Sequence, residues 1–202
     1  MNPPSQSPCP DNEPEWRRFA ACYLADQFPE RPPADLSNPT IFSSSPLEGE
    51  GPVVLYEFSA NPGNHEESCY FVAVGKTVPN YYPAYGLDVH EAYDLHLGTR
   101  FMLVMGVGQA NASRLSEFDA AARAREIVDR VAPGEPIEGL KVSSAFEVAG
   151  QLHVVLSCTL GGERVFLFAG ECPPGFSRRA DVPPNVVYRI HLGRVLRGEP
   201  GD

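Results

Sequence analysis

Basic residues are scarce in this sequence of 202 residues: two lysines and fourteen arginines face 26 acidic residues, for a net charge of −10. Binding to a phosphate backbone draws its affinity from clustered positive charge, so we do not expect a nucleic-acid-binding protein. The arginines between positions 178 and 197 are interpreted as solvent-exposed surface charges and not as a nucleic-acid-binding patch. Long apolar runs are also lacking, because no stretch reaches the ~18 residues of a membrane span. We therefore expect no membrane partner.

Cysteine motifs are absent as well. The five cysteines are scattered and none forms Cys-x-x-Cys, which excludes a zinc knuckle and a thioredoxin-type motif. The first residues lack the basic and apolar regions of an export signal. We therefore expect a reducing, cytoplasmic location with idle thiols, and no cofactor.

Proline is plentiful, but it is concentrated near the N-terminus, where it excludes long helices and central strands. We predict a mobile tail over 1–14, a docking helix with an extended proline-rich connector over 15–52, one domain over 53–197, and a tail over 198–202. The helix is predicted because one face carries apolar residues at helical spacing from Trp16 to Leu24. Docking of this helix on its own domain and docking on a partner are both open.

The remaining pattern predicts alternating strands and helices. Apolar runs at 53–59 and 69–74 predict a hairpin with a long loop, and the run 101–107 predicts a strand covered on both faces. A short helix is expected around 89–97. A longer one is expected from 116 to 131, where Ser116 and Asp119 resemble a capping box.

The C-terminal third predicts a four-strand meander. A two-residue turn at Gly161–Gly162 pairs Cys158 with Val165, and a three-residue turn over 149–151 places Phe146 opposite Val154. Residues 186–192 predict the last strand. We find no internal repeat. The predicted fold class is α+β: a largely antiparallel sheet, made of an N-terminal hairpin, a central strand and the meander, packed against two or three helices.

A metal site is the first candidate for chemistry, from His90 and Asp94 with His65. On a helix His90 and Asp94 share a face, but His96 lies about 120° away from His90 around the axis. The zincin His-Glu-x-x-His spacing is missing. A surface ion pair and a buried His96 explain these residues as well, so we predict no metal ligands.

Two further local patterns are weak. Cys69 lies close to His65 in sequence, but a nucleophile and its base normally come from separate elements. Gly106-x-Gly108 lacks the third glycine of a dinucleotide fingerprint, and no phosphate-binding lysine follows it. We predict no catalytic residues from either pattern.

The least ordinary feature is a tyrosine-rich loop. Tyr81, Tyr82, Tyr85 and Tyr93 lie within thirteen residues, between prolines and a glycine. Rigid loops that carry amphipathic rings are typical of recognition surfaces, although the rings could instead roof the core. With Trp16, they form our predicted binding residues.

The leading hypothesis is therefore a non-enzymatic domain that binds another macromolecule, most simply a protein, with no prediction of oligomeric state. One alternative is a hydrolase or transferase with a His/Asp-based, metal-dependent site. A second is a small-ligand-binding module with a pocket between the sheet and the helix 116–131.

Overall fold

The chain has the predicted α+β class, with helices packed on two antiparallel sheets. A computed structural model describes residues 13–30, 32–33, 35–49, 51–59, 69–76 and 79–199. These residues contain no helix with the length and apolar content needed to cross a membrane. The chain divides into two compact units, 1–96 and 97–202, whose boundary falls within one helix. The expected division, with one domain over 53–197, places its boundaries elsewhere.

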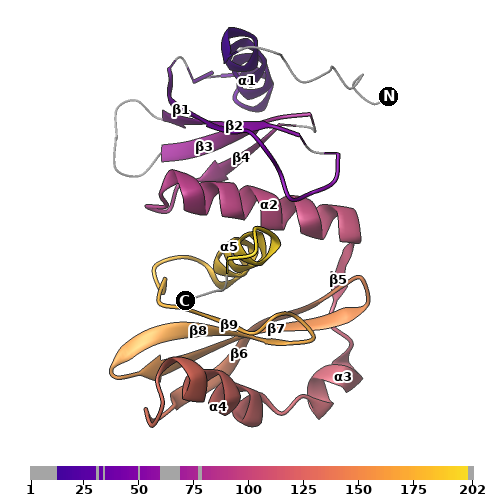
Figure 1. The fold of residues 1–202 in the computed structure, drawn as a ribbon, viewed down its shortest axis with the longest axis vertical. Helices are drawn as coiled ribbons and strands as arrows, with labels where there is room; N and C mark the ends of the chain where they lie inside the picture. Colours follow the sequence, from indigo (N-terminus) through magenta and orange to yellow (C-terminus); the bar gives the residue numbers. More distant parts are fainter. Residues whose placement is uncertain are drawn as a thin grey trace. The chain divides into compact units, whose positions relative to one another are not determined.

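The first unit is a helix, a four-stranded antiparallel meander and the start of a second helix (Figure 1). Its elements are α1 (Glu13–Gln27), β1 (Leu36–Phe42), β2 (Val53–Ser59), β3 (Cys69–Val74), β4 (Asn80–Pro83) and α2 (Val89–Met105). Trp16, Ala20 and Leu24 of α1 are buried against one face of the sheet. The N-terminal helix thus docks within its own unit.

The second unit contains the end of α2 and a five-stranded antiparallel sheet in the order β5-β6-β7-β8-β9. Its elements are β5 (Val107–Gln109), α3 (Ala112–Glu117), α4 (Ala120–Val131), β6 (Glu138–Val148), β7 (Gln151–Leu160), β8 (Glu163–Gly170), β9 (Gly175–Ser177) and α5 (Pro184–Leu196). In Figure 1, α4 and α5 cover opposite faces of this sheet. The α4 side is an apolar cluster that includes Ile127, Val128 and Leu156.

The two units repeat one architecture, helix–four-strand meander–helix, which the sequence analysis missed. Between β3 and β4 the pairs are Phe71 with Tyr82 and Val72 with Tyr81. The same register recurs 95 positions later between β8 and β9, where Phe166 pairs with Ser177 and Leu167 with Phe176. The following helices carry Tyr-x-Leu-His-Leu-Gly at 93–98 and Tyr-x-Ile-His-Leu-Gly at 188–193. The shared register and helix motif indicate an internal duplication.

Three local predictions were wrong. Residues 186–192 were predicted as a strand but lie in helix α5, which begins at Pro184. Proline is favoured at the first position of a helix, because the N–H that it lacks would have no partner within the helix there. Helix α4 was predicted to begin at Ser116 but begins at Ala120. Its N-cap is Asp119, whose side chain accepts a hydrogen bond from the Ala122 N–H. Part of the predicted connector forms the edge strand β1.

The meander register was predicted correctly at one turn and incorrectly at the other. Cys158 pairs with Val165 across Gly161–Gly162, as expected. At the other turn, Val148 pairs with Gln151, so the turn has two residues and Phe146 faces His153. Ala149 has a φ of +51° and Gly150 one of +77°, the left-handed pair that a tight hairpin turn requires.

Candidate interaction surface

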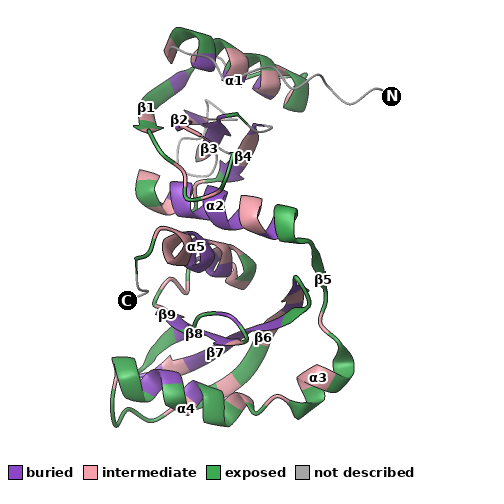
Figure 2. Cartoon of the chain, turned by 45° about the vertical axis from the view of Figure 1, so that its right-hand side comes forward, coloured by how far each residue is buried: buried purple, intermediate pink, exposed green. Residues whose placement is uncertain are grey.

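An exposed apolar segment is the most unusual feature of the surface. Leu103, Val104 and Met105, at the end of α2, are 63%, 71% and 44% exposed, and Val107 in β5 is 51% exposed. Figure 2 shows this end of α2 and β5 as a continuous exposed stretch. We call residues 103–107 the apolar segment. Contiguous exposed apolar side chains of this kind mark interaction sites, whereas single ones are ordinary.

The apolar segment corrects the prediction of a buried central strand over 101–107. Helix α2 ends at Met105. The next residue, Gly106, has a φ of +78°, which is typical of the residue that follows a helix. The chain then enters β5, which pairs with β6. Periodicity did not show this, because a short, wholly apolar run fits a strand and a helix equally well.

The end of α5 has no such segment among the residues that the structure describes. Helix α5 ends at Leu196, and the positions that match Leu103 and Val104 hold Gly198 and Glu199. The longer, apolar helix end is therefore specific to α2. Packing of the repeated architecture does not require it.

Strand β5 is an end strand of its sheet, and all three of its residues are exposed. The outer edge of such a strand presents backbone N–H and C=O groups that can pair with another strand. Because β5 begins at Val107, the last residue of the apolar segment, the two form one continuous surface that offers apolar contact and backbone hydrogen bonds.

A charged network holds the chain after β5 in place. The Arg114 guanidinium bonds the Gly150 carbonyl at 2.7 Å and the Glu147 carboxylate at 3.3 Å, and it forms an ion pair with Glu171. Hydrogen bonding from the Leu152 N–H, aided by Arg114, lowers the pKa of Glu171. These bonds tie α3 to the β6–β7 turn, so the surface is ordered before any partner arrives.

The predicted binding residues do not gather on one exposed face. Trp16, Tyr82 and Tyr93 are buried, Tyr81 is half-buried, and Tyr85 is 40% exposed. The Tyr82 hydroxyl lies 3.2 Å from His96 Nδ1, and the Tyr93 ring stacks on Phe42 at 3.8 Å. Most of these rings therefore pack within the first unit, and only Tyr85 offers an exposed ring at the surface.

The candidate metal residues also separate. His90 is exposed, with its ring edge against Phe42, whereas Asp94 and His96 are buried. His65 lies outside the described residues. Among the residues that the structure does describe, no three His, Cys, Asp or Glu side chains come together as a metal site requires.

The second unit buries a polar cluster that the sequence did not reveal. The Tyr188 hydroxyl is bonded to His153 Nδ1 and lies beside the Cys172 thiol, while His191 Nε2 bonds the Pro173 carbonyl at 2.9 Å. Burial lowers the pKa of both histidines and raises the pKa of Cys172 to about 11. Burial thus favours the protonated form of this thiol, which is a weaker nucleophile than a thiolate.

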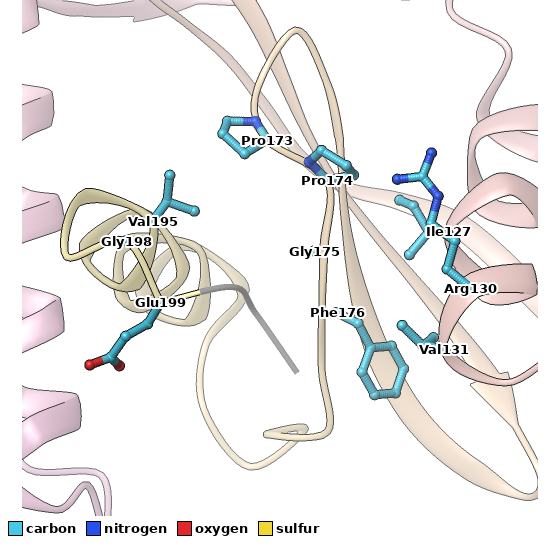
Figure 3. A pocket seen from close by; sticks show the side chains of 10 residues that line it. All are labelled: Ile127, Arg130, Val131, Pro173, Pro174, Gly175, Phe176, Val195, Gly198 and Glu199. Atoms are coloured by element: carbon cyan, nitrogen blue, oxygen red, sulfur yellow. The ribbon is translucent and has the colours of Figure 1, made fainter.

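The second unit also has an open hollow of about 500 Å³ between α4, the β8–β9 connection and the end of α5 (Figure 3). Ile127, Val131 and Phe176 supply apolar walls. Its two charged residues are already engaged, since Arg130 pairs with Glu126 and Glu199 with Arg197. The hollow lies near the place expected for a small-ligand pocket, but it lacks convergent polar groups to orient a ligand.

Comparisons with protein-family models, with curated proteins and with solved structures find no match to this chain.

Proposed function

We propose that this chain is a non-enzymatic protein-binding domain and that its contact surface is the apolar segment with the free edge of β5. One observation carries the proposal: three exposed apolar side chains end helix α2 directly before an exposed edge strand, whose first residue, Val107, is a fourth. Strand addition at such an edge supplies affinity through main-chain hydrogen bonds, and neighbouring apolar side chains supply further burial.

The sequence-based hypothesis of a macromolecule-binding protein is kept, but its surface is changed. The tyrosine-rich loop is largely packed inside the first unit, and helix α1 is docked on its own sheet. The apolar segment, by contrast, exposes side chains that the repeated architecture does not need. We also propose a cytoplasmic location, which the unpatterned cysteines support.

The test is affinity capture with a matched pair of variants in the full chain. Val104→Lys places a charge in the apolar segment, and Val142→Lys places the same charge at another exposed valine, in β6. Loss of one buried valine contact is worth about 1.5–3 kcal/mol, so the first variant should weaken binding about ten- to 100-fold. The second should bind as the unmodified chain does. Equal capture by all three chains would contradict the proposal.

A further inference from the structure

We infer that the partner of this surface is a second copy of the same chain. In this arrangement two β5 strands pair antiparallel across a two-fold axis and join two five-stranded sheets edge to edge. The apolar segment of each copy lies beside the joined strands. This inference rests on the proposed function and names the occupant of that surface.

The protection of the other sheet edges supports this arrangement. Natural sheets block unwanted edge pairing with prolines, bulges or charges. Strand β1 contains Pro39 and a register shift between Ser37 and Thr40. Strand β4 ends in Pro83, and β9 is flanked by prolines at 173–174 and by arginines at 178–179. Strand β5, with the sequence Val-Gly-Gln, contains no proline or charged residue, and its pairing with β6 has no register shift. Its length of three residues limits how many hydrogen bonds a second strand can add.

Charge favours a copy of the chain over a charged partner. Each copy carries a net charge of −10, which opposes the approach of two copies. At physiological salt, charges more than about 8 Å apart are largely screened, so this repulsion is smallest where the contact itself contains no charge. The stretch from Phe101 to Ser113 contains no charged residue. Two such stretches can meet without burying a charge, whereas a basic partner would find no acidic group there to recognise.

The geometry is also self-complementary. A two-fold axis brings identical patches together, and a strand that pairs with its own copy across such an axis must run antiparallel. From side-chain sizes, the four exposed residues present roughly 400 Å² per copy. Leu103, Val104 and Met105 follow one another at about 100° around the helix axis, so one partner covers only part of this area. Two copies with their strand edges would bury on the order of 1,000–1,200 Å², the lower end for a specific interface. Interfaces of this size are of the weak, transient class, so we expect a dimer whose formation depends on the protein concentration.

The experiment is sedimentation equilibrium of the full chain from about 1 to 100 μM. The fitted mass should rise with concentration from 22.0 kDa towards twice that value. Val104→Lys should raise the dissociation constant at least tenfold, and Val142→Lys should leave it unchanged. Gly108→Lys is the second variant, since a Cβ at Gly108 has no neighbour within 4 Å and its lysine would charge the strand edge itself.

Far-ultraviolet circular dichroism checks that each variant folds. If Val104→Lys does not fold, the dissociation constant of Gly108→Lys tests the dimer in its place. Amide exchange at 107–109 should slow as concentration rises in the unmodified chain. A mass of 22.0 kDa at every concentration overturns the inference, and so does a dimer that Val104→Lys and Gly108→Lys both leave intact. If the chain is monomeric at every concentration, the proposed protein-binding function is still supported when another protein is captured by the unmodified chain and by Val142→Lys but not by Val104→Lys.

Discussion

Gly175→Ala should destabilise the second unit through a single collision. A Cβ at Gly175, in β9, would lie 2.6 Å from His191 Nδ1 and closer still to the ring carbon between the two nitrogens. The ring has little room to retreat, because it stacks on Phe168 at 4.4 Å and its Nε2 bonds the Pro173 carbonyl. The added methyl group therefore requires either displacement of the ring or movement of β9.

The magnitude follows from the two contacts at risk. Overpacking a core by one methyl group costs about 1–3 kcal/mol, and losing a hydrogen bond adds about 1 kcal/mol. We expect Gly175→Ala to cost about 2–4 kcal/mol, which for a chain of this length lowers the thermal midpoint by roughly 5–15 °C. Differential scanning calorimetry measures this shift.

A double-mutant cycle isolates the collision. His191→Ala removes the ring, so Gly175→Ala in that background should cost less than about 0.5 kcal/mol, for a coupling of about 2–3 kcal/mol. If Gly175→Ala costs the same with and without the His191 ring, the reasoning from this contact is refuted.

Three other predictions concern the same unit and the thiols. Burial lowers the pKa of His153 and His191, so below pH 6.5, the ordinary pKa of histidine, the unfolded chain binds more protons than the folded chain. Stability should therefore be full above pH 6.5 and fall as the pH drops below it. Urea midpoints measure this fall, which should be smaller in His191→Gln. Asp119→Ala removes the cap of α4 and should cost about 1 kcal/mol, while Asp119→Asn should cost much less. In peptide mapping after alkylation of the native chain, exposed Cys22 should react and buried Cys172, with its raised pKa, should not; equal labelling would contradict its burial.

Patterns that depend on neighbouring residues were predictable from the sequence. Helix α1 followed from the spacing of Trp16, Ala20 and Leu24, which the structure buries on one face. The register across Gly161–Gly162 followed from strand alternation and a two-residue turn. Both signals are local, because a helix face and a hairpin register are set within about ten residues.

The internal duplication had a signal that went unused. Tyr93-x-Leu-His-Leu-Gly and Tyr188-x-Ile-His-Leu-Gly match at four identical positions, with a fixed spacing that also aligns Phe71 with Phe166. The predicted last strand at 186–192 hid this match, because it assigned the second copy of a helix motif to a strand. The match between the two motifs predicts both that residues 188–193 are helical and that the chain contains a repeat.

The sequence by itself determined the α+β class, the helix α1, the antiparallel pairing of 53–59 with 69–74, and one turn of the meander. Only the tertiary structure decided that residues 101–105 are the exposed end of a helix and that β5 lies at a sheet edge. The physical reason is that exposure belongs to the packed chain: an apolar side chain has the same local pattern whether the fold covers it or leaves it at the surface.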